Sequence, residues 1–447
     1  MDRNLRPVDA IAIIVGVVIG VGIFRAPAMV ASGVDSSGGF VLLWFLGGVL
    51  SLCGALCYAE LVTAFPNAGG EYHFLHRAFG HNVSFLFAWA RLSVIGTGSI
   101  ALLAFVLGDH LQALIPLGTY GSAIYAALLV CLVVAINVLG IRFGTALQNV
   151  LTISLVVGLV AVTIGALVAA PSGTAALSSP ATSSVGLAMV FVLLTYGGWN
   201  EAAYLSAEVR GGPRRMVYAM VGGVGAVTAI YVVAGYAYAS VLGIDGLRAS
   251  ETPGLTLAST LVGTSGAVVI GLLVAAAALT SMNATILTVS RTAYALGRDV
   301  RMLRRLGRWD DRAGAPVPAL LALGGFTLAL ILVGALARRG FATMVEYTAP
   351  VFWGFFLLTG MSLFVLRRTE PNAVRPFRVP LYPVIPIVFC ATCAWLLYAS
   401  LAYTKTGALV GLGVLALGAV PLVHGKELRH AATLDDVDRG DRAPGSV

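Results

Sequence analysis

A glycine-rich apolar segment near the start of the chain, residues 11–27, reads IAIIVGVVIGVGIFRAP. It is apolar enough to enter a lipid bilayer, yet its middle holds Gly16, Gly20 and Gly22. Glycine destabilises a helix interior by about 1 kcal/mol relative to alanine, and bare backbone groups at membrane depth are tolerated only against protein or a water-filled cavity. Two interpretations follow. Either the helix is interrupted to offer its backbone to a ligand, or Gly16 and Gly20 form a helix-packing face.

The composition is typical of an integral membrane protein. Of 447 residues, 58% are hydrophobic and 11% are charged, and the mean hydropathy is +0.92; a soluble domain carries about 25% charged residues. The net charge of +8 comes from arginines in short loops, without a basic patch interleaved with aromatics, so we expect no nucleic-acid partner. The five cysteines lie in apolar runs without metal-site spacing, so we expect no metal site from them.

Twelve apolar segments reach the roughly 20 residues that a bilayer crossing needs. They cover residues 8–32, 39–63, 83–108, 120–138, 144–169, 186–207, 216–242, 263–290, 317–336, 342–366, 383–403 and 406–424. An even number places both termini on one side. Arginines crowd the loops on that side, as at 298–312, whereas the other side holds Arg248, Arg338, Arg339 and Lys405. The positive-inside rule then predicts cytoplasmic termini, in a multi-pass protein of the plasma (inner) membrane.

The glycine interruption has a counterpart in the sixth span, at residues 196–200 (YGGWN). Five spans separate the two interruptions, and an odd offset places them in halves of opposite orientation. Paired broken helices in two inverted halves are typical of the central site of a transporter. The expected division is a cytoplasmic N-terminus 1–7, a first repeat 8–170, a second repeat 186–366, two further helices 383–424 and a disordered cytoplasmic tail 425–447.

A broken helix offers both signs of partial charge to one ligand. The N-terminal end of a half-helix carries free N–H groups and suits a carboxylate. The C-terminal end of the opposing half-helix carries free carbonyls, which suit an ammonium group. A zwitterion the size of an amino acid satisfies both ends, so this pattern favours a substrate with α-amino and α-carboxylate groups.

Further motifs lie in and beside the spans. They are residues 15–28 (VGVVIGVGIFRAPA), 54–61 (GALCYAEL), 66–72 (PNAGGEY) with 78–80 (AFG), 196–200 with Glu208 and 213–214 (PR), and 366–368 (LRR) with Pro371 and 375–380 (RPFRVP). Together they resemble the amino acid–polyamine–organocation permeases, in particular the L-type amino acid transporter branch, over nearly all of residues 5–425. The resemblance implies an all-α polytopic LeuT-type fold with 12 transmembrane helices: a 5+5 inverted repeat plus two C-terminal helices, with spans 1 and 6 unwound at the midplane.

The resemblance also implies a substrate site made of backbone groups. The substrate carboxylate would lie on the amides of Val21, Gly22 and Ile23. The ammonium group would lie on the carbonyls of Val18 and Leu194. The adjoining residues of the sixth span complete this implied site: Tyr196, Gly197, Gly198 and Trp199.

Two departures from the branch bear on gating and coupling. Many members carry a gating aromatic where this chain has Leu194, so gating would pass to Trp199 or another aromatic. Many also carry a lysine where this chain has Leu155. That lysine stands where sodium-coupled relatives hold sodium, so its absence leaves exchange, proton coupling and facilitated transport open. A sodium site remains an alternative, formed by Gly16, Ile19, Ser281 and Thr285.

Charged residues within membrane spans are expensive and suggest function. We expect Arg25 and Glu346 to pair in an outer vestibule, and Glu60 and Glu201 to carry a proton or form an inner gate. Arg91 is a further buried charge. The alternatives are structural ion pairs and side chains that snorkel to the interface.

Polar residues of the third and eighth spans are candidates to contact the substrate side chain. They are Ser93, Thr97, Ser99 and Asn283. Serine and threonine also occur routinely where membrane helices pack, so a purely structural role is the competing interpretation.

The predicted function is a secondary active permease for small or medium neutral L-amino acids, working by alternating access with sodium-independent exchange or proton coupling. The alternatives are a cationic amino-acid or polyamine exchanger and a non-transporting amino-acid sensor. We expect no cofactor and no enzymatic activity, because the chain has neither a phosphate-binding Gly-x-x-x-x-Gly-Lys loop nor a converging nucleophile and base. The partners expected are the amino acid and the lipid bilayer, and the sequence leaves the oligomeric state open.

Overall fold

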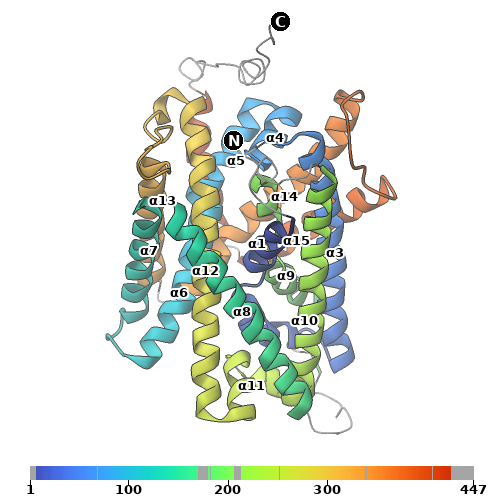
Figure 1. The fold of residues 1–447 in the computed structure, drawn as a ribbon, viewed down its shortest axis with the longest axis vertical. Coiled ribbons are helices and arrows are strands. Elements are labelled where there is room, and N and C mark those ends of the chain that lie inside the picture. Colours follow the sequence, from blue (N-terminus) through green and yellow to red (C-terminus); the bar gives the residue numbers. More distant parts are fainter. Residues whose placement is uncertain are drawn as a thin grey trace, which may run out of the picture.

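The computed structural model is helical in the parts of the chain that it describes (Figure 1). These are residues 7–67, 69–139, 141–169, 180–181, 183–205, 213–250, 252–337, 340–404 and 406–423. The α-helices are α1 (Pro7–Val18), α2 (Gly22–Ala31), α3 (Ser37–Ala64), α4 (Glu71–Phe79), α5 (His81–Ala90), α6 (Gly96–Leu114), α7 (Gly121–Leu139), α8 (Ile141–Ala169), α9 (Val185–Thr195), α10 (Pro213–Ala249), α11 (Pro253–Val262), α12 (Thr264–Asp299), α13 (Val317–Leu336), α14 (Gly340–Thr369), α15 (Val384–Thr404) and α16 (Thr406–Val423). Three short helices of other types are η1 (Arg91–Ile95), η2 (Trp199–Leu205) and η3 (Arg301–Leu303). The expected tail 425–447, and the N-terminal segment up to residue 6, lie outside the described residues.

Nine helical stretches in the described residues are long and apolar enough to cross a membrane. They are Ser37–Ala64, His81–Gln112, Gly121–Leu139, Val150–Ala169, Arg214–Ala249, Val268–Asp299, Val317–Leu336, Thr343–Thr369 and Val384–Ala402. Each coincides with one of the twelve expected spans. The remaining three spans contain shorter helices: α1 and α2 in 8–32, α9 and η2 in 186–207, and α16 in 406–424. An all-α polytopic fold is therefore confirmed.

Helix starts follow the local sequence where a serine precedes an apolar run. The hydroxyl of Ser36 accepts a hydrogen bond of 3.1 Å from the amide of Gly39 and caps α3. Ser184 caps α9 in the same way, through the amide of Leu187 at 3.2 Å. Such caps satisfy one of the amides that the first turn of a helix leaves unpaired, so both helices begin at fixed positions.

The helices α3 and α10 lie side by side through much of the bundle (Figure 1). Between them and the sixth span is a buried aromatic group made of Trp44, Tyr196 and Tyr231. The Tyr196 ring lies 5.0 Å from that of Tyr231, and its hydroxyl donates to the Trp44 carbonyl at 2.9 Å. Because lipid is as apolar as the side chains, such packing and hydrogen bonds hold membrane helices together.

A buried carboxylate fastens the connection after α14 to the end of α3. Glu60 is 1% exposed and lies 2.5 Å from Arg367 and 3.5 Å from Arg375, both measured to guanidinium nitrogens. It also accepts a hydrogen bond of 2.7 Å from the amide of Val379. We call these four residues the Glu60 clamp. They lie in two of the motifs quoted above, which the fold brings into contact.

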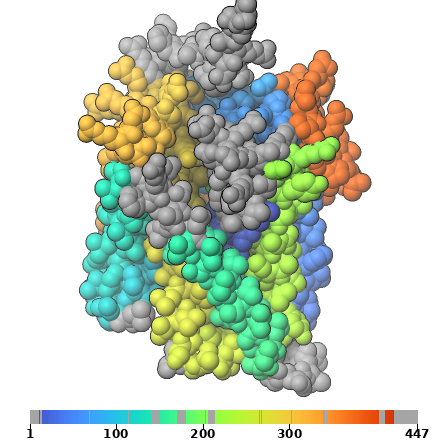
Figure 2. Space-filling model, in the orientation of Figure 1, coloured from blue at the N-terminus to red at the C-terminus, as the bar shows by residue number. Residues whose placement is uncertain are grey.

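The two ends of the bundle differ in their loops. Helix α4 lies near one end of the long axis and α11 near the other (Figure 1). Figure 2 shows two projections at the α4 end, one formed by the segment after α12 (gold) and one by the segment between α14 and α15 (orange). The first carries exposed arginines at positions 304, 305, 308 and 312. Basic side chains are thus gathered at the α4 end.

Candidate functional site

Two helix interruptions face each other in the middle of the bundle. Helix α1 ends at Val18 and α2 begins at Gly22, so residues 19–21 lie between them. Helix α9 ends at Thr195, and residues 196–198 precede η2. These are the positions where the sequence predicted breaks, and each break coincides with glycines.

The two interruptions touch. A Cβ atom placed on Gly22 would lie 2.8 Å from Cγ2 and Oγ1 of Thr195, and one on Gly198 would lie 2.9 Å from Cγ1 of Val17. Gly198 also has a φ of +110°, a backbone conformation that side chains disfavour. These two glycines therefore allow close packing of one broken segment on the other. That the first interruption offers its backbone to a ligand stays a prediction.

Opposite helix ends meet at this contact. Helix α2 starts at Gly22. The amide of Phe24 donates to the Val21 carbonyl at 3.2 Å, whereas those of Gly22 and Ile23 precede the first full turn and have no carbonyl partner within α2. Helix α9 presents its last carbonyls at the same place; that of Leu194 accepts a hydrogen bond of 3.1 Å from Gly197. The Val18 carbonyl accepts two, from Gly20 and from the Tyr231 hydroxyl, both at 2.8 Å. The site thus offers a partial positive charge on one side and a partial negative charge on the other.

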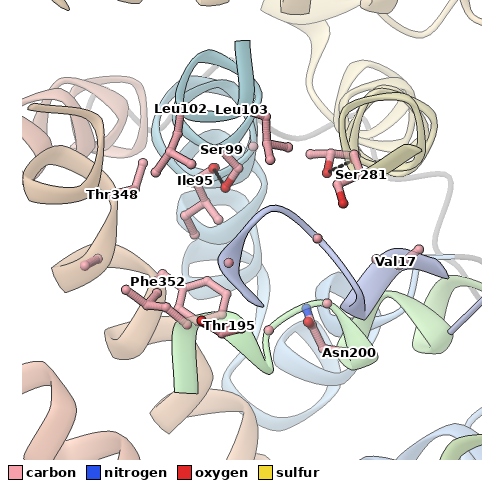
Figure 3. A pocket seen from close by; sticks show the side chains of 18 of the residues that line it. Val17, Ile95, Ser99, Leu102, Leu103, Thr195, Asn200, Ser281, Thr348 and Phe352 are labelled. Carbon is pink, nitrogen blue, oxygen red and sulfur yellow. Dashed lines mark hydrogen bonds between the residues drawn. The ribbon is translucent and has the colours of Figure 1, made fainter. Parts of the chain in front are cut away.

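A cavity of about 260 Å³ adjoins these ends. Figure 3 shows Ile95, Ser99, Leu102 and Leu103 on one wall, with Ser281 and the pair Thr348 and Phe352 on others. Ligand pockets for drug-sized molecules span about 300–1,000 Å³, so this cavity suits a smaller molecule. Its walls are mostly apolar, and its backbone groups lie beside the broken segments.

Most hydroxyls on the cavity wall donate within their own helix. Ser99, Thr195, Thr285 and Thr348 each bond a carbonyl four residues earlier at 2.8 Å. Ser281 differs, because its buried Oγ has no hydrogen-bond partner among the described residues. A Cβ on Gly20 would lie 3.2 Å from that oxygen, so Ser281 faces the first interruption. It is a polar group available to whatever enters the cavity.

A buried charged cluster closes the end of the cavity nearest α4. The Glu71 carboxylate accepts from the hydroxyls of Tyr58 and, at 2.9 Å, Tyr204. Arg91 lies 3.4 Å from Glu71 and 2.6 Å from Glu201, and its guanidinium stands 4.2 Å from the centre of the Tyr204 ring. We call these five residues the Glu71 cluster. Glu71, Arg91 and Glu201 line the cavity.

The cluster sets two carboxylates against one guanidinium. Burial raises the pKa of Glu71 above its ordinary value, and the nearby Arg91 charge opposes this rise. The side-chain amide of Asn200 donates a further hydrogen bond of 3.3 Å to the Glu71 carboxylate. Because η1, η2 and α4 each contribute a charge, the cluster ties three separate elements together at the end of the cavity.

Comparison with known proteins matches the chain to a transporter family. The sequence profile described as "Amino acid permease" covers residues 5–415. The chain belongs to this amino acid permease family. The b(0,+)-type amino acid transporter 1 of Rattus norvegicus is 31% identical over 410 residues, which are 89% of this chain and 82% of the relative. The serine/threonine exchanger SteT of Bacillus subtilis (strain 168) is 26% identical over 97% of this chain and 98% of the relative. The large neutral amino acids transporter small subunit 2 of Mus musculus is 28% identical over 94% and 80%.

The family membership confirms an amino acid permease, not an enzyme, as the class of protein. Within this permease, seven of the predicted substrate-site residues line the cavity: Val18, Val21, Gly22, Ser99, Leu194, Gly197 and Gly198. So do Arg25 and Glu201, as well as Ser281 and Thr285 from the sodium alternative.

Other predicted site residues lie outside the cavity lining. Asn283 is 1% exposed and its side-chain oxygen accepts from Asn137 at 2.8 Å. Thr97 and Ile23 are fully buried in helix contacts. Tyr196 points to Trp44, as described above.

Trp199 is not among the cavity-lining residues either. It packs in an aromatic group with Tyr58, Phe356 and Phe389, at centroid distances of 5.0, 5.6 and 6.2 Å. Its side chain is 4% exposed. The sequence predicted that gating passes to Trp199 or another aromatic. Because a gate must face the cavity, the positions of the side chains favour another aromatic over Trp199. An aromatic that does face it is Phe352 of α14 (Figure 3).

The coupling candidates divide in the same way. Glu60 is bound by the other residues of the Glu60 clamp and is not among the cavity-lining residues. This favours a structural ion pair over a proton carrier or an inner gate. Arg25 lies 3.9 Å from Asp109, and its pairing with Glu346 stays a prediction. Leu155 is fully buried. Among the residues of the sodium alternative, Gly16 packs against Thr152. A Cβ atom placed on Gly16 would lie 2.5 Å from Cγ2 of Thr152.

The sequence reasoning missed Glu71 and Phe352. Glu71 stands in the motif 66–72, which lies between two expected spans, so no apolar run marks it as buried. Phe352 is one of several aromatics in an apolar run, and periodicity alone does not single out the one at the cavity. Among the described residues, no group of three histidine, cysteine or acidic residues is placed to hold a metal ion.

Proposed function

We propose that this permease carries small or medium neutral L-amino acids by alternating access, as a sodium-independent exchanger. The observation that carries the proposal is the meeting of the α2 and α9 ends at a 260 Å³ apolar cavity. A zwitterion is held by the two helix ends, and the apolar wall accepts an uncharged side chain. The relative named a serine/threonine exchanger matches almost its whole length and supports exchange.

The finer architecture is part of the same proposal. We take the chain as twelve spans, a LeuT-type 5+5 inverted repeat with two added helices, and the breaks as unwound segments at the midplane. The arginines gathered at the α4 end support cytoplasmic termini at that end of a plasma (inner) membrane protein. Spans 1, 2, 6 and 7 rock against 3, 4, 8 and 9.

At the site, the amides of Val21 and Gly22 receive the substrate carboxylate. A carbonyl has two lone pairs, and that of Val18 already accepts two hydrogen bonds. The Leu194 carbonyl is likewise approached by two backbone amides, those of Gly197 and Tyr196, so Val18 and Leu194 both stay candidates to receive the ammonium group. Ser281 adds a hydroxyl beside the break, and Phe352 takes the place of the gating aromatic. Proton coupling stays open through Glu201, and a sodium ion beside Ser281 is the less favoured alternative.

One observation keeps a cationic substrate in consideration. The Glu71 cluster holds two carboxylates and one guanidinium, so its charges do not balance when all are ionised. A basic side chain reaching toward that end of the cavity would be attracted. The sensor alternative differs in predicting ligand binding without movement of substrate.

Counterflow in proteoliposomes separates these functions. Vesicles preloaded with unlabelled alanine receive labelled alanine, serine, leucine, arginine or putrescine, each with and without sodium and a pH gradient. We expect uptake of the neutral amino acids that requires internal amino acid and ignores sodium. Uptake of arginine or putrescine as fast as that of the neutral amino acids refutes the preference for neutral substrates. Stimulation by sodium refutes sodium-independent exchange, and binding without uptake establishes a sensor.

A further inference from the structure

A second cavity, separate from the substrate cavity, opens on the outside of the bundle. Its volume is about 430 Å³. It is lined by Phe85 and Trp89 of α5, Ser93 of η1, Ala329 of α13, Leu417 of α16 and Met302 of η3. We call it the α5–α13–α16 groove.

The polar groups that line the groove are already engaged. The indole N–H of Trp89 donates to the Val414 carbonyl at 2.8 Å, and the Ser93 hydroxyl donates to the Trp89 carbonyl at 2.7 Å. The Tyr347 hydroxyl donates to the Ser93 carbonyl at 2.9 Å. A polar ligand would lose its hydrogen bonds to water without replacement here, so the groove suits a hydrocarbon chain.

The groove opens between membrane-spanning helices. Ala329 is exposed and Leu417 is 66% exposed, so its sides face outward from the bundle. Trp89 stands eight residues into the span that starts at His81, and Ala329 twelve residues into the span that starts at Val317. At 1.5 Å per residue these depths are about 12 and 18 Å, close to half of a hydrocarbon core of about 30 Å. The groove therefore reaches the depth of one leaflet.

Positive charge stands beside the groove. The helix η3, which contributes Met302 to the lining, is followed directly by Arg304, Arg305 and Arg308, whose side chains are exposed. This is the gold projection at the α4 end of Figure 2. Basic residues beside the membrane surface attract anionic lipid headgroups, and guanidinium groups form paired hydrogen bonds with phosphate.

We propose that the α5–α13–α16 groove binds an anionic phospholipid of the leaflet on the arginine-rich side. One acyl chain lies in the groove, and the phosphate headgroup lies on the arginines at 304, 305 and 308. The groove walls come from the third, ninth, tenth and twelfth expected spans, so the bound lipid joins the added C-terminal helix to the rest of the bundle.

Native mass spectrometry of the purified full chain tests this proposal, with phosphatidylglycerol and phosphatidylcholine of equal chain length as probes. The variants Ala329→Trp and Leu417→Trp each fill the groove from one side; Leu332→Trp is the matched control on an exposed position of α13 outside it. The double variant Arg304→Gln/Arg305→Gln removes headgroup contacts, and Arg214→Gln/Arg215→Gln removes an equal charge elsewhere.

We expect wild type to retain phosphatidylglycerol in preference to phosphatidylcholine, and each groove-filling variant that folds to lose this lipid while Leu332→Trp retains it. Arg304→Gln/Arg305→Gln weakens phosphatidylglycerol binding by up to about 30-fold, whereas Arg214→Gln/Arg215→Gln leaves it near wild type. Equal retention of the two lipids, an equal loss in both arginine pairs, or full retention in both groove-filling variants overturns the proposal. A lipid-free dimer, in which a second copy of the chain fills the groove, also overturns the proposal.

Discussion

Replacing Arg91 with methionine removes the only positive charge that we find in the Glu71 cluster among the described residues. Arg91 lies 2.6 Å from Glu201 and 3.4 Å from Glu71, and it is 3% exposed. Without it, two carboxylates face each other in a buried site. Breaking a buried ion pair from one side costs about 3–5 kcal/mol, so we expect the free energy of unfolding of Arg91→Met to fall by that amount.

The matched control is Arg77→Met. Arg77 lies 2.7 Å from Glu370, as close as Arg91 to Glu201, but the side chains of that pair are 41% and 29% exposed. Exposed ion pairs contribute about 0–1 kcal/mol. Unfolding by sodium dodecyl sulfate in mixed micelles measures both variants. Equal losses in Arg91→Met and Arg77→Met would refute the reasoning, because burial would then make no difference.

A second change tests the cause of the loss. Adding Glu201→Gln to Arg91→Met removes one of the two unpaired carboxylates, so part of the stability should return, with a coupling of about 0.5–3 kcal/mol between the positions. The loss of Arg91 also removes the interaction that opposes the burial of Glu71, so the pKa of Glu71 rises further. The deficit of Arg91→Met should then shrink as the pH is lowered. A deficit independent of pH and of Glu201→Gln would show a packing defect instead.

Three further outcomes are expected. Gly22→Val abolishes amino-acid binding, because its Cβ would lie 2.8 Å from Thr195, and wild-type affinity in a binding assay would contradict the site. Phe352→Ala enlarges the cavity and raises the ratio of leucine to alanine uptake about tenfold or more; an unchanged ratio would place Phe352 outside the substrate's reach. Hydrogen bonds from Arg77 lower the pKa of Glu370 below its ordinary 4.5, so this pair stabilises the fold above that value and the stabilisation is lost as the pH falls through the lowered pKa. The thermal unfolding temperature of Glu370→Gln should therefore depend less on acid pH than that of wild type, and identical profiles would exclude this contribution.

Local pattern predicted the breaks and the spans because each depends on nearby residues. Gly22 and Gly198 interrupt apolar runs that are otherwise long enough to cross a membrane, and the helices end beside them. The arrangement of charges was harder to predict. Glu60 meets its partners more than 300 positions away in the sequence, so spacing alone gave no means to tell a structural clamp from a proton carrier.

The direction in which a side chain points could not be predicted from the sequence either. Trp199 and Phe352 are both aromatics near the breaks, but the first packs against Tyr58 and the second faces the cavity. Which way each ring points depends on how η2 and α14 rotate against their neighbours. Glu71 shows the same limit, because its burial comes from α3, η1 and η2 closing around α4 rather than from an apolar run of its own.

The Glu60 clamp has a mechanical consequence for transport. In the rocking proposed above, α3 belongs to the moving bundle, yet its end at Glu60 is fastened to the connection that follows α14. A rigid rod tethered at one end can only swing about that tether. Helix α3 begins at Ser37, 23 residues before Glu60, so its far end lies about 35 Å from the tether at 1.5 Å per residue and travels farthest for a given rotation. The pivot of the permease should therefore lie near Glu60, and the widest opening should occur at the opposite end of the molecule, beside the start of α3.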